Sequence, residues 1–182
     1  MSNLSLERWI SESIREIVFG LEDSLVSTLG ALTGIAIGAN NTFIVILSGL
    51  VILAAECTSM AAGSYLSSKS ALETEAVIHR HDGISPHTQE SPVRAAMVMG
   101  LCYLVGGVVP LLPYFLFPIS FALIVSIPLT AVVLFLVGVW SSHFTKRPAF
   151  RSGVEMAIIS LSAALIGYVI ARAVNWYFGI NV

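Results

Sequence analysis

The chain has 182 residues, of which 56% are hydrophobic and only 11% are charged, and its formal net charge is −2. Soluble domains carry about 25% charged residues. This composition, with a mean hydropathy of +0.87, therefore excludes an ordinary soluble protein and indicates an integral membrane protein. No basic stripe that would bind nucleic acid is present. Both cysteines lie in apolar segments, which excludes the disulfide framework of a secreted protein.

Five apolar segments predict an all-α membrane fold with five transmembrane helices, because each approaches the ~20 residues that cross a bilayer. The predicted spans are residues 17–39, 43–67, 93–115, 119–140 and 153–175. Together they form one transmembrane domain over residues 17–182. Ahead of it, residues 1–16 place Leu6, Trp9 and Ile10 on one helical face, which predicts an amphipathic helix at the membrane surface.

Residues 68–92 are predicted to form a polar cytosolic loop, because Gly83, Pro86 and Pro92 interrupt any long helix there. The segment holds histidines and acids that could collect a divalent ion at the mouth of a transport path. They are His79, His81, Asp82, His87 and Glu90. Loop histidines are more often simply solvated, and this spacing matches no tight metal site, so the sequence leaves metal capture open.

Basic residues set the predicted orientation of the chain in the membrane. They precede the first span and lie in the second and fourth connections, whereas the other two connections have none. The positive-inside rule then puts the N-terminus in the cytosol and the C-terminus outside, with Arg172 as the one exception. No cleavable signal peptide is visible, so we expect a prokaryotic plasma membrane, with a vacuole-like membrane as the alternative.

Three acids inside the first two spans are the most informative residues of the chain. Glu22 and Asp23 lie side by side in the first span, and Glu56 lies at the middle of the second. A carboxylate at the centre of a bilayer costs roughly 2.5–3.5 kcal/mol, so such residues usually face a cavity, an ion path or a partner. Met60 follows Glu56 by four residues and shares its helix face. Carboxylate oxygen and thioether sulfur together predict a transition-metal site. Its candidate ligands are Asp23, Met60, Glu56 and Glu22.

Each candidate ligand also has a structural interpretation. Glu22 and Asp23 lie close enough to the membrane interface to stay hydrated. Met60 could simply fill the core, and Glu56 could make a hydrogen bond across the bundle. Because adjacent helix positions point about 100° apart, only one of Glu22 and Asp23 can face a narrow path squarely, and we favour Asp23.

Proton coupling has three candidates, Glu56, Glu22 and Glu155, because a carboxylate can exchange a proton for a metal ion at the same oxygens. Glu155 lies one turn into the fifth span and could instead bridge to Arg151, four residues earlier, which is the interpretation we favour. No nucleophile–base pair, phosphate-binding glycine loop or helical zinc motif is present, so the chain is predicted not to be an enzyme.

Gly30, Gly34 and Gly38 form a small-xxx-small ridge along the first span, which lets another helix approach closely. The ridge suits a homodimer seam, a contact between the first and second spans, or ordinary packing within one bundle. The sequence does not choose among these three contacts.

Four stretches, in order along the chain, resemble the vacuolar iron transporter family. They are residues 15–28 (REIVFGLEDSLVST), 59–67 (SMAAGSYLS), 110–114 (PLLPY) and 151–156 (RSGVEM). The resemblance implies a five-span homodimer that carries Fe²⁺, and often Mn²⁺, out of the cytosol in exchange for protons. It also implies a path at the dimer interface, lined by the first two spans, with Asp23 and Met60 matching the family's metal site.

The chain departs from the family's pattern in several places. Glu22 and Ser24 flank Asp23 where the family often has Asn and Gly, and Ser64 stands where a Glu is common. Many members carry a long Glu-rich cytosolic domain where this chain has only residues 68–92. We therefore predict a homodimeric exporter of Fe²⁺ or Mn²⁺ in a lipid bilayer, without a permanently bound cofactor. A carrier of another divalent or organic cation, and a non-transporting membrane scaffold, are the alternatives.

Overall fold

The computed structural model describes the backbone of residues 3–82 and 91–179 as five α-helices, and this part of the chain contains no strand. The helices are α1 (Asn3–Ala39), α2 (Thr42–Asp82), α3 (Pro92–Leu116), α4 (Ile119–Thr145) and α5 (Ala149–Phe178). Side chains are described for residue 10 and for residues 13–77 and 91–179. The prediction of an all-α fold is confirmed.

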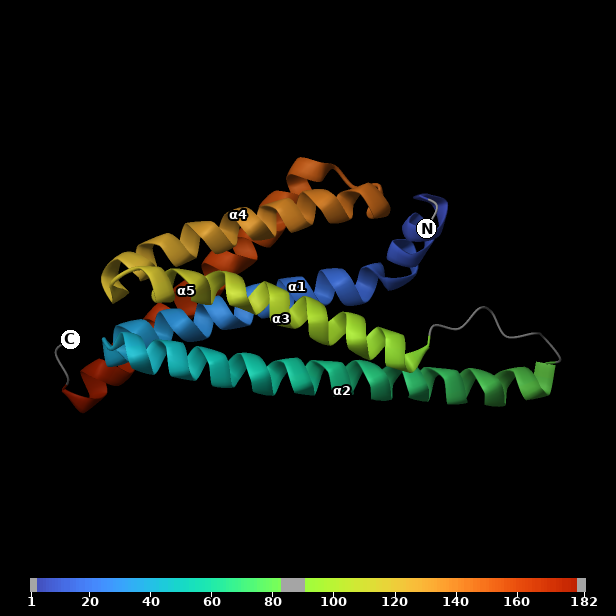
Figure 1. Ribbon diagram of the computed structural model, residues 1–182, viewed down its shortest axis with the longest axis horizontal. Helices are drawn as coiled ribbons and strands as arrows, with labels where there is room; N and C mark the ends of the chain where they lie inside the picture. The colour runs from blue at the N-terminus through green and yellow to red at the C-terminus, as the bar shows by residue number, and fades with distance from the viewer. Residues whose placement is uncertain (1–2, 83–90, 180–182) are drawn as a thin grey trace.

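The helices form an elongated bundle with α1 at its centre (Figure 1). α1 packs mainly against α3 and α5, whereas α2 packs chiefly against α3, and α4 against α5. Very short connections make α1 and α2, and likewise α3 and α4, antiparallel neighbours. We call the end of the bundle that holds Arg94 and Arg151 the basic end, and the end where α1 passes into α2 the opposite end.

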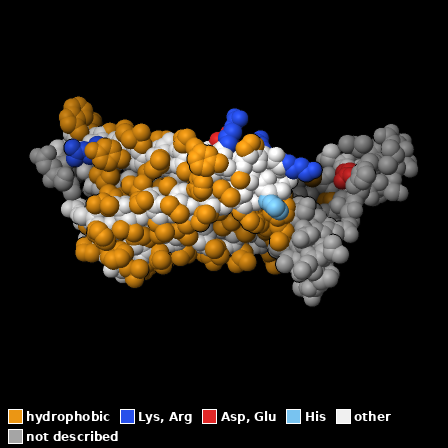
Figure 2. Space-filling model, turned by 90° about the horizontal axis from the view of Figure 1, so that it is seen from above, with side chains coloured by type: hydrophobic (Ala, Val, Ile, Leu, Met, Phe, Trp, Pro, Cys, Tyr) orange, Lys and Arg blue, Asp and Glu red, His pale blue; other side chains and the backbone are white. Residues whose placement is uncertain are grey.

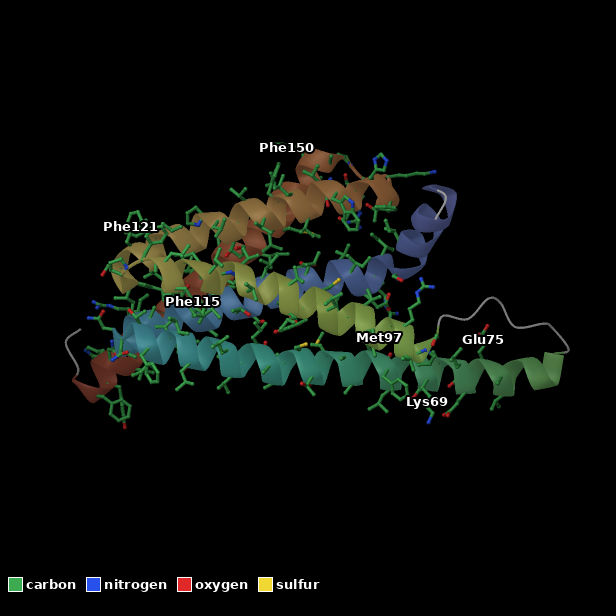
Figure 3. The ribbon with its side chains drawn as sticks, viewed as in Figure 1. Lys69, Glu75, Met97, Phe115, Phe121 and Phe150 are labelled. Carbon is green, nitrogen blue, oxygen red and sulfur yellow. The ribbon has the colours of Figure 1, made fainter. Side chains whose placement is uncertain are left out.

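Four helices within the described residues are long and apolar enough to cross a membrane. These are residues Thr42–Val77 of α2, and α3, α4 and α5. Large apolar side chains such as Met97, Phe121 and Phe150 are exposed on them, and Phe121 and Phe150 point away from the bundle in Figure 3. Hydrophobic side chains also cover most of the described face in Figure 2. A surface this apolar is suited to lipid, so the chain is an integral membrane protein.

The central helix α1 is the one predicted span that does not meet this criterion. Its acids and bases make it less apolar than the other helices, and Glu22 and Asp23 lie within the predicted membrane segment. Its place between α3 and α5 covers much of its surface with protein. A helix shielded in this way needs less apolar surface than one facing lipid.

α2 continues as a helix through Asp82, although the sequence predicts a loop from residue 68. No Gly or Pro occurs between Gly63 and Gly83, so a helix already formed in the membrane can extend by one backbone hydrogen bond per residue. Lys69 lies on this extension, where Figure 3 labels it. Its Nζ atom lies 3.9 Å from Glu73 Oε1 one turn later, which makes a weak exposed ion pair. The extension projects well beyond the rest of the bundle in Figure 1.

α1 likewise begins at Asn3 and runs without a break through the segment predicted as a separate amphipathic helix. Figure 1 shows this first part bending away from the bundle axis. The side chains that define the predicted apolar face, Leu6 and Trp9, lie outside the described residues. The amphipathic surface therefore stays a prediction.

The glycine ridge of α1 packs against α5. A Cβ atom at Gly30 would lie 3.2 Å from the carbonyl oxygen of Ala163, and one at Gly34 would lie 3.2 Å from that of Gly167. A Cβ atom at Gly167 would lie only 2.1 Å from the carbonyl oxygen of Gly30, so the two backbones touch. For these positions the structure selects packing within one bundle, while Gly38 meets no atom within 4 Å.

The two ends of the bundle differ in character. A hydrophobic core closes the opposite end and consists of Leu32, Ala36, Val45, Leu111, Tyr114 and Ala122. Polar groups are buried at the basic end, where Arg94 Nη2 donates a 2.7 Å hydrogen bond to Ser13 Oγ. The Glu16 carboxylate is buried beside them and pairs with Arg15 Nε at 3.3 Å. The Arg94–Ser13 hydrogen bond fastens α1 to α3, whereas the Arg15–Glu16 pair lies within α1.

Candidate functional site

Glu56 is held by hydroxyl groups from two other helices. Its Oε2 atom accepts a hydrogen bond from Ser27 Oγ of α1 at 3.1 Å, and a second from the Tyr103 hydroxyl of α3. The two hydroxyl oxygens lie 2.8 Å apart. Tyr103 is fully buried, with 0% of its surface exposed, whereas Glu56 and Ser27 remain partly exposed. Three helices thus meet at one carboxylate oxygen, which satisfies a charged group that would be costly to bury alone.

We call Glu56, Ser27 and Tyr103 the Glu56 cluster. Asp23 and Met60 lie nearer the basic end than this cluster. Asp23 is partly buried one turn before Ser27 on α1, and its charge interacts with that of Glu56. Met60 lies one turn beyond Glu56 on α2 and lines a cavity of about 500 Å³, together with Phe19 of α1. Phe19, Asp23 and Ser27 are spaced by four residues and share one face of α1. The structure therefore brings Asp23 and Glu56 together and places Met60 beside the same face.

Glu22 lines a different cavity. This cavity, of about 390 Å³, lies between α1, α4 and α5, and its polar lining includes Arg15, Arg147 and Ser152. Glu22 and Asp23 are separated because adjacent helix positions point about 100° apart. Glu22 is turned towards α4 and α5, whereas Asp23 interacts with Glu56 of α2. Of the predicted ligand set, Glu22 is thus the member that lies apart from the Glu56 cluster.

Glu155 forms the bridge that its spacing predicts. Its Oε1 atom accepts a hydrogen bond from Arg151 Nε at 3.1 Å, and its Oε2 atom lies 4.0 Å from Arg147. All three side chains are largely exposed at the basic end, where they line a cavity of about 340 Å³. The structure does not bring Glu155 to the Glu56 cluster.

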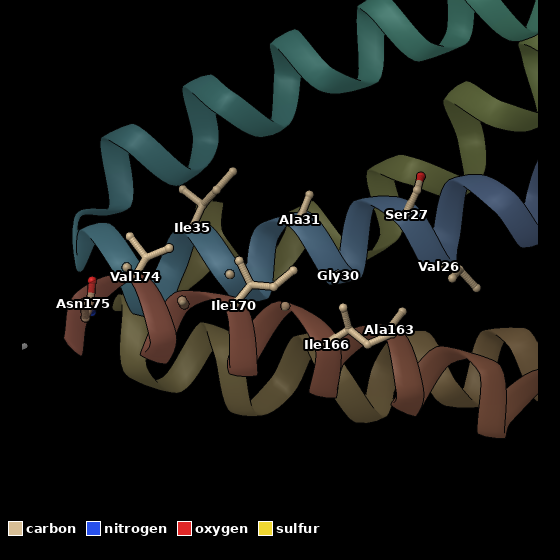
Figure 4. A pocket seen from close by; sticks show the side chains of 14 residues that line it. Val26, Ser27, Gly30, Ala31, Ile35, Ala163, Ile166, Ile170, Val174 and Asn175 are labelled. Carbon is tan, nitrogen blue, oxygen red and sulfur yellow. The ribbon is translucent and has the colours of Figure 1, made fainter. Parts of the chain in front are cut away.

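An apolar groove leads from the cluster toward the opposite end. It encloses about 570 Å³ between α1 and α5, beginning at Ser27 and ending at Asn175 (Figure 4). Its floor includes the close contact of Gly30 and Gly34 with Gly167. The Asn175 side chain is buried, and its Nδ2 atom has no hydrogen-bond partner among the described residues.

Sequence reasoning missed Ser27 and Tyr103. Ser27 could have been found, because it follows Asp23 by four residues and so lies on the same helix face. Tyr103 carries no such signal, since only the packing of α3 against α2 decides which α3 side chain reaches Glu56. No group of three His, Cys, Asp or Glu side chains suited to a metal ion occurs in the described part of the chain. The predicted loop ligands, such as His79 and His87, lie outside the described side chains.

Comparison with known proteins identifies the family of this chain. A family model described as the VIT family matches residues 14–82 and 72–172, which is most of the chain. The chain belongs to the VIT family. An uncharacterized protein of Methanocaldococcus jannaschii is 30% identical over 170 residues, covering 87% of this chain and 88% of that protein.

Two plant relatives carry functional names. Vacuolar iron transporter homolog 2 of Arabidopsis thaliana is 26% identical over 170 residues, covering 92% of this chain and 87% of its own length. Vacuolar iron transporter 1 of Tulipa gesneriana is 36% identical over 94 residues, but the match spans 51% of this chain and only 38% of the tulip protein. The predicted resemblance is confirmed. The VIT family is a family of metal-ion transporters, which also confirms the prediction that the chain is not an enzyme.

Proposed function

We propose that this VIT family member exports Fe²⁺, with Mn²⁺ as a second ion, from the cytosol in exchange for protons. The observation that supports this most strongly is the Glu56 carboxylate, which accepts hydrogen bonds from two other membrane helices and whose charge interacts with that of Asp23 on α1. Iron is favoured because the plant relatives are named for its transport. The basic end is the cytosolic end in this proposal, and α1 crosses the membrane together with the four helices α2 to α5.

An ion entering from the basic end meets Asp23 and Met60 first, and Glu56 next. One helical turn separates Met60 from Glu56, so about 6 Å lies between them along α2. The Asp23 carboxylate attracts the cation, and the Met60 thioether favours an Fe²⁺-like ion over Mg²⁺ or Ca²⁺, which take oxygen ligands. Glu56 then supplies a second carboxylate deeper in the membrane.

Protons drive release of the metal in this mechanism. A carboxylate oxygen that takes up a proton loses its charge and its value as a metal ligand, so proton and metal compete for one site. Glu56 is the principal candidate for this exchange because it is the deepest acid of the path. Glu22 is the second candidate, acting from the neighbouring cavity through its proximity to Asp23, and Glu155 is the third.

A homodimer completes the path. Asp23 and Glu56 are both partly exposed at membrane depth, and a carboxylate facing hydrocarbon would cost several kcal/mol. A second copy placed against this face of α1 and α2 shields the acids and contributes the same ligands from its own chain, as a two-fold interface requires. Exposed small residues on α2, such as Ala55 and Ala62, allow the close approach that this arrangement needs.

Metal flux into proteoliposomes tests the proposal. Fe²⁺ or Mn²⁺ is added outside vesicles that contain a metal-quenched dye, with and without a pH gradient. Metal that enters through the wild-type protein should quench the dye, and the quenching should depend on the pH gradient. Vesicles with Asp23→Ala or Glu56→Gln should not show this quenching. Glu73→Gln is the matched control, because this exposed acid lies on the α2 extension beyond the predicted span. Flux of neither metal through folded, dimeric wild type would favour another cation or a scaffold.

Intact proton-coupled flux in Glu56→Gln would disprove the mechanism while leaving metal transport in place. Gradient-dependent flux lost in Glu22→Gln but kept in Glu56→Gln would move proton exchange to the cavity between α1, α4 and α5.

A further inference from the structure

The two oxygens of the Glu56 carboxylate are not equivalent. Ser27 and Tyr103 both donate to Oε2, whereas Oε1 takes no hydrogen bond within the described part of the chain. Tyr103 cannot swing away freely, because its side chain is fully buried in α3 among the helices of the bundle. One oxygen is therefore committed to the protein, and the other is left for a ligand.

We propose that Tyr103, with Ser27, makes Glu56 a one-oxygen metal ligand and thereby discriminates against Ca²⁺. This inference rests on the proposed transport of Fe²⁺ through the Glu56 site. Tyr103 acts here as a positioning residue that never touches the ion. It determines specificity by occupying the oxygen that a second metal–oxygen bond would need.

The discrimination follows from coordination chemistry. Ca²⁺ takes six to eight oxygen ligands at 2.3–2.6 Å and commonly uses both oxygens of a carboxylate. Transition-metal ions are satisfied by fewer ligands, and the Met60 sulfur adds a soft ligand that Ca²⁺ gains little from. A carboxylate that can bind only through Oε1 withholds one oxygen ligand from Ca²⁺. An Fe²⁺ ion beside Met60 can bind without that second oxygen.

The same restriction governs release of the transported ion. A carboxylate that binds through both oxygens holds a divalent ion more tightly than one that binds through a single oxygen. A carrier must bind its ion weakly enough to let it leave. Tyr103 and Ser27 therefore lower the affinity of the site in favour of faster turnover.

A purely structural role for Tyr103 predicts a different outcome. Loss of a hydrogen bond between helices would reduce the amount of folded protein and lower the maximal flux, while leaving the KM for Fe²⁺ and the effect of Ca²⁺ unchanged. The ligand-restricting role changes both KM and Ca²⁺ sensitivity. These two readouts separate the interpretations.

The test measures Fe²⁺ flux in proteoliposomes at increasing Ca²⁺ for wild type, Tyr103→Phe and Ser27→Ala. In Tyr103→Phe the Ca²⁺ concentration that halves the flux should fall on the order of tenfold, the scale of one hydrogen bond to a charged group. The KM for Fe²⁺ and the turnover number should both fall. Ser27→Ala should shift in the same direction by less, because water can replace a partly exposed hydroxyl.

Tyr114→Phe is the matched control. Tyr114 is another buried tyrosine of α3, and its hydroxyl has no hydrogen-bond partner among the described residues. It lies in the core at the opposite end, so its removal should leave KM and Ca²⁺ sensitivity unchanged. A Tyr103→Phe protein that fails to fold would leave Ser27→Ala to decide the question.

Two failures are distinguishable. Wild type that carries no Fe²⁺ overturns the proposed function and this inference with it. Wild type that carries Fe²⁺, with Tyr103→Phe and Ser27→Ala unchanged in KM and in Ca²⁺ sensitivity, overturns the inference alone.

Discussion

Gly167 lies where α5 crosses α1, and replacing it with alanine tests how closely those helices approach. The added Cβ atom would lie 2.1 Å from the carbonyl oxygen of Gly30. Contacts of this kind become ordinary at 3.4 Å, so the helices would have to separate by about 1.3 Å, the difference between these distances. The obstructing atom is backbone and cannot rotate away. Overpacking of this kind costs about 1–3 kcal/mol.

A thermal-unfolding scan of the purified protein in detergent measures this cost. For a chain of this size each kcal/mol corresponds to roughly 2–4 °C, so a cost of about 1–3 kcal/mol should lower the Tm of Gly167→Ala by roughly 2–12 °C. Gly38→Ala is the control, because a Cβ atom there meets nothing within 4 Å and should leave the Tm unchanged. Equal Tm values for both variants and wild type would refute the close α1–α5 crossing.

Three further predictions follow from single contacts. Met60→Leu keeps the side-chain volume and removes the sulfur. The KM for Fe²⁺ in the flux assay should rise roughly tenfold, and inhibition of the flux by Mg²⁺ should increase. An unchanged KM would remove Met60 from the site. Ser13→Ala deletes the 2.7 Å hydrogen bond from Arg94. The free energy of unfolding should fall by about 1.5–3 kcal/mol, which a thermal scan detects as a lower Tm. No change in Tm would mean that this bond does not fasten α1 to α3. Glu155→Gln breaks an exposed salt bridge to Arg151, so the free energy of unfolding should fall by less than about 1 kcal/mol. Metal flux should still depend on the pH gradient. Loss of that dependence would instead assign Glu155 to proton exchange.

The helical architecture could be predicted from the sequence because it rests on local information. Apolar runs of nearly bilayer length need no knowledge of their neighbours to be recognised as helices. Their boundaries were harder to predict. α2 runs on to Asp82 because nothing in the polar segment stops a helix that the membrane portion has already nucleated, whereas the polar composition of residues 68–82 favours a loop.

The candidate site could be predicted only in part. The cost of burying charge in a membrane singled out Asp23 and Glu56 from the sequence alone. The four-residue spacing from Glu56 added Met60, which the family resemblance also indicates. Which of two adjacent acids approaches the Glu56 cluster depends on how α1 is rotated between its neighbours. The structure turns Asp23 towards the cluster and Glu22 towards α4 and α5. Their roles as ligands stay predictions for the flux assay.

The sequence by itself determined that this chain is an all-helical membrane protein of the VIT family with acids inside its first two spans, because composition, spacing and motif order are properties of the chain alone. Only the tertiary structure decided that the glycine ridge receives α5 and that Tyr103 and Ser27 occupy one oxygen of Glu56. Both depend on how distant helices rotate and slide against one another. Interhelical packing fixes that rotation, and no local pattern in the sequence records it.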